Sequence, residues 1–136
     1  MTDEFKRNAM HAFGFSEEQV NGLSDKQKAI LHSSKARRAH KVIMEVVSAE
    51  NCACKPRIGD RYVTNGSGML QVEECTFTLC LWALAPMLPV SCVIYDRLSH
   101  GHEPNGHLID HVRCSDTGVA CGGIGTVLFK VYTLPA

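Results

Sequence analysis

The chain has 136 residues, with 14 basic and 14 acidic side chains, so its formal net charge is zero. This length suits one domain, and 45% hydrophobic residues is ordinary for a globular protein and excludes a disordered chain. The neutral balance excludes the broad basic surface that nucleic-acid binding requires, so we expect no nucleic-acid partner.

The first part of the chain carries repeated signals for short helices. Thr2 or Asp3 can cap a helix that Gly14 ends. Two capping-box patterns follow, at residues 16–19 and 24–27, and each predicts the start of another short helix.

Charge and cysteine content divide the chain into two parts. Residues 1–41 hold eight Lys and Arg against five Asp and Glu and no cysteine, whereas residues 42–136 hold six against nine. We therefore predict a helical N-terminal arm at residues 1–40 and a cysteine-bearing domain at residues 41–136. The basic run at residues 35–41 is typical of a solvated helix face, although it would also suit docking onto an acidic partner or a nucleic acid.

Short strands around one helix are predicted for the second part. Residues 75–85 have Leu, Ala and Thr at helical spacing and predict the central helix, which Pro86 ends. Because crossover helices are lacking, we expect an α+β fold with a small, mostly antiparallel sheet. The predicted strands are residues 41–47, 61–64, 91–95, 108–114 and 126–133.

The uncharged stretch from Cys75 to Tyr95 is long enough to span a bilayer core of about 30 Å. Pro86 and Pro89 interrupt it, so a buried helix followed by a turn and a strand fits better than a membrane span. Charged residues also occupy the N-terminus, where a secretory signal needs its apolar segment. We therefore expect a cytoplasmic protein that does not enter a membrane.

Cysteine is unusually frequent. The seven cysteines are odd in number, so they cannot all pair within the chain, and a reducing cytosol would keep them free. They are therefore interpreted as buried thiols, metal ligands or a reactive thiolate. Cys52 and Cys54 lie on one side of an extended segment, close enough to share a metal or to form a strained redox pair.

Histidine is concentrated in one region that also contains a cysteine. Zinc accepts imidazole and thiolate in one tetrahedral shell, and iron accepts a similar mixture. On a strand, His107 and His111 would lie too far apart for one ion, whereas on a helix they would be neighbours. A polar loop with exposed histidines and acid–base use remain alternatives. The residues concerned are His100, His102, His107, His111 and Cys114.

The cysteine-bearing part also carries a spaced pattern of short motifs. Cys52 lies seven residues before the pair Gly59-Asp60, and Cys80 opens the segment Cys80-Leu-Trp-Ala-Leu84. Cys114 lies within Val112-Arg-Cys-Ser-Asp116, ahead of the last predicted strand. This pattern resembles a small prokaryotic family of short, uncharacterised cysteine-containing proteins that has no settled activity. Cys54, the histidine region and the helical arm lie outside the family's pattern.

The resemblance implies that Cys52, Cys80 and Cys114 meet in one pocket. They would form either a three-sulfur metal site with a fourth ligand or a nucleophile with polar support, whereas unconnected packing thiols are the plain alternative. Candidates for the fourth ligand are His100, His102, His111 and Cys121.

Two functions follow as hypotheses. The first is a metal-binding accessory protein or subunit that holds zinc or iron through Cys and His, with its arm docking a larger enzyme or a second copy in a homo-oligomer. The second is a small enzyme with a cysteine nucleophile and a histidine general base, acting on a small molecule.

Overall fold

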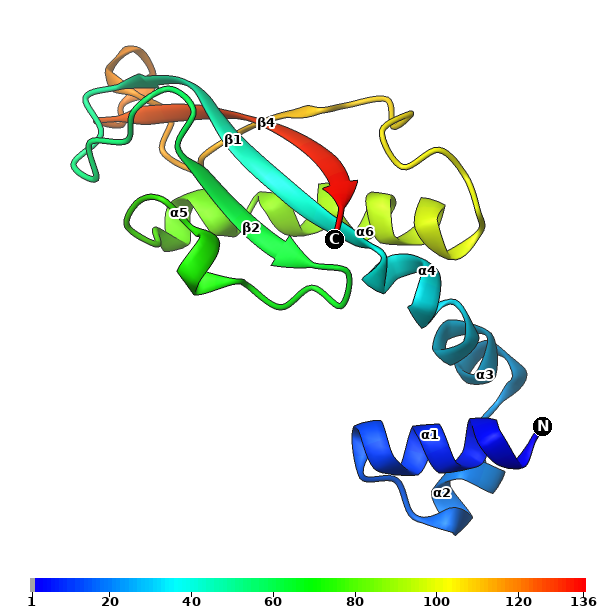
Figure 1. Cartoon of the computed structure of the whole chain (residues 1–136). Coiled ribbons are helices and arrows are strands. Elements are labelled where there is room, and N and C mark those ends of the chain that lie inside the picture. Colours follow the sequence, from blue (N-terminus) through cyan, green and yellow to red (C-terminus); the bar gives the residue numbers. More distant parts are fainter. Residues whose placement is uncertain (1) are drawn as a thin grey trace. The chain divides into compact units, whose positions relative to one another are not determined.

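The computed structural model describes residues 2–136. By its internal contacts the chain forms two compact units, of which the first ends at Ser34 and the second is Lys35–Ala136. The fold class is α+β, as predicted, with helices in the first unit and a four-stranded antiparallel sheet in the second (Figure 1).

The first unit contains three helices whose ends agree with the predicted capping signals. Thr2 caps the first helix through a hydrogen bond from the backbone N–H of Phe5, and Gly14 ends it with φ at 70°. Both predicted capping boxes are present, at Ser16 and at Ser24. The helices are α1 (Asp3–Phe13), α2 (Glu17–Asn21) and α3 (Asp25–His32).

The second unit is built on a sheet with the strand order β2-β1-β4-β3, in which every neighbouring pair is antiparallel. The two long central strands pair along almost their whole length, with one irregularity between Val46 and Ser48. The short helix α4 (Ser34–Arg38) precedes the sheet. The strands are β1 (His40–Glu50), β2 (Arg61–Asn65), β3 (His111–Arg113) and β4 (Thr126–Pro135).

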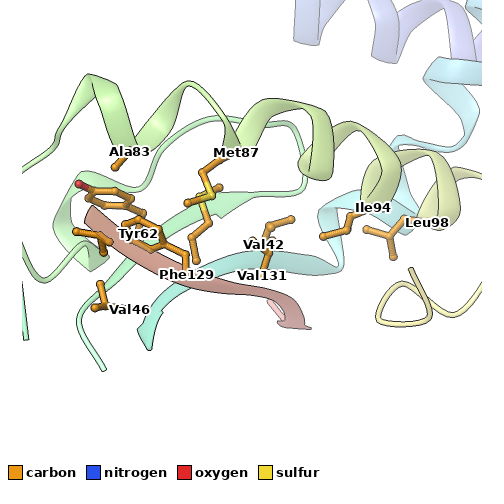
Figure 2. Packing of buried hydrophobic residues seen from close by; sticks show 11 residues of the cluster. Val42, Val46, Tyr62, Ala83, Met87, Ile94, Leu98, Phe129 and Val131 are labelled. Carbon is orange, nitrogen blue, oxygen red and sulfur yellow. The ribbon is translucent and has the colours of Figure 1, made fainter. Parts of the chain in front are cut away.

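The hydrophobic core lies between one face of this sheet and two helices, α5 (Leu81–Leu84) and α6 (Met87–Ser99) (Figure 2). Alternate residues of each strand point to this face because side chains on a strand alternate with a period of two. The helices contribute residues four or seven positions apart, which is about one or two helical turns. The core members are Val42, Met44, Val46, Tyr62, Ala83, Met87, Ile94, Leu98, Val127, Phe129 and Val131.

Three of the predicted elements were wrong in position or type. The helix predicted for residues 75–85 is restricted to α5, after the short 3-10 helix η1 (Val72–Glu74). The strand predicted for residues 91–95 lies inside α6, and the strand predicted for residues 108–114 is only the three residues of β3. Pro89 does not prevent α6 because it stands in the first helical turn, where a backbone N–H has no partner within the helix. Across residues 2–136, no helix has the length and apolar character needed to cross a membrane.

Candidate functional site

A cavity of about 270 Å³ lies in the second unit, and we call it the thiol cavity. Four of its lining residues are cysteines, and three of the others are the aromatic residues Phe77, Trp82 and Phe129. The cysteines come from three separate segments of the chain, the turn after β1, the start of α5 and the end of β3. They are Cys52, Cys54, Cys80 and Cys114.

The first two thiols are carried by a tight turn. The backbone N–H of Lys55 donates to the carbonyl oxygen of Cys52 at 3.0 Å. Asn51 and Lys55 flank this turn and are the two non-glycine residues with positive φ in the described part of the chain, at 50° and 47°. Such backbone conformations cost roughly 1–3 kcal/mol each and tend to occur at functional sites. The turn is therefore held in an unfavourable conformation that brings both thiols to the cavity.

The hydroxyl group of a buried tyrosine positions the third thiol. Cys80 is the residue immediately before α5, and its backbone N–H donates to the hydroxyl of Tyr62 at 3.1 Å. The same hydroxyl donates to the carbonyl oxygen of Thr78 at 2.8 Å. The Tyr62 ring is fully buried and stacks on Phe77 with the ring centroids 4.3 Å apart. Burial raises the pKa of Tyr62, so the phenol stays protonated and keeps both bonds.

The fourth thiol is fixed against the last strand. The backbone N–H of Cys114 donates to the carbonyl oxygen of Val127 at 2.9 Å, and the N–H of Val127 donates to the Cys114 sulfur at 3.2 Å. The next residue, Ser115, donates its N–H to the carbonyl oxygen of Trp82 at 2.8 Å, which ties this segment to α5. The Cys114 sulfur also donates to the carbonyl oxygen of Asp116 at 3.7 Å, so the thiol is held in place by hydrogen bonds from two sides.

One aspartate shapes the loop that closes the cavity. The carboxylate of Asp116 accepts hydrogen bonds from the backbone N–H groups of Gly118, Ile124 and Gly125, each at 3.0 Å. These bonds hold the pKa of Asp116 below its usual value, so it is ionised at neutral pH. The loop also approaches the cysteine turn closely, since a Cβ at Gly125 would lie 2.8 Å from the carbonyl oxygen of Asn51. Figure 1 shows this loop, in orange, beside the loop that follows β1.

Cys54 is the central thiol of the group. Desolvation and the neighbouring thiols of Cys80 and Cys52 raise the pKa of Cys54 to about 11. A thiol with this pKa is almost entirely protonated at neutral pH and is a poor nucleophile. The cavity therefore brings several thiols close together but does not activate Cys54 as a nucleophile.

The thiol cavity brings together Cys52, Cys80 and Cys114, the three cysteines of the resemblance, and adds Cys54. Tyr62 and Asp116 support these thiols, and neither role follows from the sequence. A signal for Asp116 exists in retrospect, because an aspartate two residues before a glycine often binds the backbone of its own turn.

The other predicted ligands lie elsewhere. His100 follows α6, and its Nδ1 lies 2.8 Å from the carbonyl oxygen of Asp96. The rings of His100 and His102 have their centroids 6.3 Å apart, and His111 hydrogen-bonds through Nδ1 to Asp110 at 2.7 Å. None of these three histidines is among the lining residues of the thiol cavity described here. Cys121 is exposed at the end of the 3-10 helix η2 (Val119–Cys121).

All seven cysteines are free thiols. Within residues 2–136, no group of three or more His, Cys, Asp or Glu side chains is already placed so as to hold a metal ion. Comparison with protein-family models, with curated proteins and with solved structures found no match to this chain. The chemistry of the site is therefore argued from its own geometry, and membership of the cysteine-containing family stays a prediction.

Proposed function

We propose that the protein binds one thiophilic metal ion, zinc or iron, through the four cysteine thiols of the thiol cavity. The observation that carries this proposal is the gathering of four cysteines from three chain segments around one apolar space. Packing alone would accept valine or alanine at such positions, whereas zinc and iron are commonly held by four thiolates.

The surroundings of the thiols support this use. The hydrogen bond from Val127 to the sulfur of Cys114 is of the kind that orients and tunes a metal-bound thiolate. The thiols of Cys54, Cys80 and Cys52 lie close enough to oppose one another's ionisation, and a bound cation would offset that repulsion.

Binding requires the thiols to close around one point and each coordinating thiol to release its proton. A cysteine has a single side-chain torsion, so reorienting a thiol between its staggered positions costs little conformational entropy. Each coordinating thiol releases its proton to solvent, so the affinity for the metal rises with pH. The number of protons released per ion bound reports how many thiols coordinate it.

A thiol-dependent enzyme is supported less well. The expected histidine general base is missing from the lining of the thiol cavity within residues 2–136, and the raised pKa of Cys54 keeps that thiol protonated. The docking role of the N-terminal arm stays a prediction.

The test is metal analysis of the full chain purified without added metal, followed by removal of metal and titration with Zn²⁺, Fe²⁺ or Co²⁺. We expect one tightly bound ion per chain, protons released on binding, and thiolate-to-cobalt charge-transfer absorption. Cys54→Ser and Cys80→Ser should each lose the ion. Cys92→Ser is the matched control because Cys92 is an exposed cysteine on α6, and it should keep the ion.

Variants His100→Ala, His102→Ala and His111→Ala should also keep the ion, since these side chains lie outside the cavity. Circular dichroism and thermal unfolding would show that each variant is folded. A folded wild-type chain that takes up none of the three metals would overturn the proposal, as would unchanged affinity in both Cys54→Ser and Cys80→Ser.

A further inference from the structure

A second cavity, of about 470 Å³, lies in the same unit, and we call it the polar cavity. Glu45, Lys130 and Tyr132 enter it from β1 and β4, at strand positions that alternate with the core residues. These side chains therefore lie on the sheet face opposite the hydrophobic core. The lining side chains are Glu45, Asn105, His107, Asp110, Lys130 and Tyr132.

Two hydrogen bonds attach one segment of the chain to β4 beside the polar cavity. Asn105 accepts a hydrogen bond from the backbone N–H of Thr133 at 2.7 Å through its Oδ1. Five residues later, the carbonyl oxygen of Asp110 accepts from the N–H of Val131, also at 2.7 Å. Leu108, between these two hydrogen-bonded residues, is 98% exposed. The space beside this segment is thus a fixed feature of how it joins the strand.

His107 lines this cavity and has a ring nitrogen without a partner. Its Nδ1 lies 2.9 Å from the carbonyl oxygen of Pro104, and because a carbonyl only accepts, Nδ1 holds the proton of the neutral ring. Nε2 is then left with a lone pair. This atom is buried and has no hydrogen-bond partner within the described residues 2–136. Buried polar atoms without a partner are rare in folded proteins, so we expect a water molecule or a ligand to donate to this atom.

The charged groups of the polar cavity have both signs. Glu45 and Lys130 are register partners on β1 and β4, and Glu45 accepts a hydrogen bond from the hydroxyl of Tyr132 at 2.7 Å. Asp110 hydrogen-bonds with His111, and that bond together with nearby Lys130 holds the pKa of Asp110 below its usual value. Acidic and basic side chains therefore line one small space.

We infer that the polar cavity binds a small zwitterion of the α-amino acid class. Glu45 and the Nε2 atom of His107 would receive the ligand's ammonium group, and Lys130 would pair with its carboxylate. Opposite charges on the cavity wall match a ligand with opposite charges a short distance apart, whereas a sugar or polyol needs only neutral hydrogen-bonding groups. This inference is independent of the metal proposal.

The probes are the free α-amino acids, added singly to the full chain and followed by calorimetry and by thermal unfolding. At least one should bind and raise the unfolding temperature, because a ligand that binds only the folded state stabilises it. The N-acetyl derivative and the amide of that amino acid each lack one charge and should bind about tenfold more weakly or not at all.

Three variants test the assigned contacts. Glu45→Gln and Lys130→Gln each remove one charge, and His107→Asn keeps a donor for Pro104 while removing the Nε2 acceptor. Each should weaken binding about tenfold or more while the chain remains folded. Cys80→Ser should leave amino acid binding unchanged, which separates this inference from the metal proposal. Absence of binding by every free amino acid would overturn the inference, as would equally tight binding of the N-acetyl derivative and the amide. Affinity unchanged in all three variants, or binding of glycerol or glucose alone, would also overturn it.

Discussion

The hydroxyl of Tyr62 accepts a hydrogen bond from the backbone N–H of Cys80 at 3.1 Å. This contact joins the edge strand β2 to the start of α5, because Tyr62 lies on β2 and is buried in the core. The position of one candidate metal ligand is therefore set by the hydrophobic core. Damage to this contact should affect stability and metal binding together.

Tyr62→Phe should destabilise the protein by roughly 1–3 kcal/mol, because it leaves the N–H of Cys80 and the carbonyl of Thr78 without their partner. The stacked ring beside Phe77 is retained, so the loss measures the hydroxyl alone. Chemical denaturation gives the free energy of unfolding, and zinc titration gives the affinity, which should also fall. Tyr132→Phe is the control, since it loses one bond to Glu45 and does not line the thiol cavity. Equal effects of the two variants would contradict this role for Tyr62.

Asp116 should give the protein an acid-sensitive contribution to stability. Its folded-state pKa is lowered, so the unfolded state binds the proton more tightly. The contribution is therefore complete above the unfolded-state pKa and is lost as the pH falls through the folded-state pKa. Asp116→Asn should be less stable than the wild type at pH 7, because its amide cannot accept all three N–H groups.

The difference between wild type and Asp116→Asn should shrink below about pH 4, where the Asp116 carboxyl of the unfolded chain begins to bind a proton. Urea unfolding at a series of pH values measures this difference directly. Glu50→Gln, at the exposed end of β1, is a charge-matched control and should change stability little at any pH. A constant difference between wild type and Asp116→Asn across the acid range would refute the proposed linkage.

Local signals in the sequence predicted the local structure well. The capping boxes at Ser16 and Ser24 formed as predicted because a cap depends on residues only three positions apart. The strands around residues 41–47, 61–64 and 126–133 were also confirmed, since their apolar patterns match the pleat.

Features that depend on the path of the chain could not be predicted in this way. The β-branched residues near Ser91 favour a strand locally, but burial against the sheet makes them part of α6. The same helix also moves the histidines away from the thiols. Its 13 residues extend about 20 Å, with α5 and the thiol cavity before it and His100 after it. The spacing of the histidines and cysteines in the sequence does not reveal this separation in space.

Gly125→Ala should disturb the contact between the closing loop and the cysteine turn. The new Cβ would lie 2.8 Å from the carbonyl oxygen of Asn51 and 3.0 Å from Cα of Cys52, which are backbone atoms with little freedom to move. Overpacking of this kind costs roughly 1–3 kcal/mol, and the shift of Cys52 should weaken zinc binding. Gly22→Ala is the control, because its Cβ would make ordinary contacts from 3.4 Å outward. Stability and affinity equal to those of the control would show that the loop does not press on the turn.

Met87→Ala should destabilise the protein by about 2–5 kcal/mol, because it opens a cavity in the core between α6 and the sheet. Met87 is 1% exposed, whereas its neighbour Leu88 is 66% exposed. Leu88→Ala should therefore change the free energy of unfolding by only about 0.5 kcal/mol. Thermal unfolding of the two variants compares adjacent positions of one helix. Similar losses in both would mean that α6 presents a different face to the sheet.

The thiols of the metal-free protein should react with iodoacetamide in an order set by exposure and ionisation. Cys92 and Cys121 are exposed and should be labelled first, whereas Cys54, with its pKa raised to about 11, should be slow at neutral pH. The rate at Cys54 should rise steadily with pH towards that value, because the thiolate is the reacting form. Added zinc should then slow labelling at the four cysteines of the thiol cavity and leave Cys92 and Cys121 unaffected. Peptide mass spectrometry of timed samples follows each cysteine separately. Labelling of Cys54 as fast as that of Cys92 at neutral pH would contradict the burial of Cys54 beside the thiols of Cys52 and Cys80.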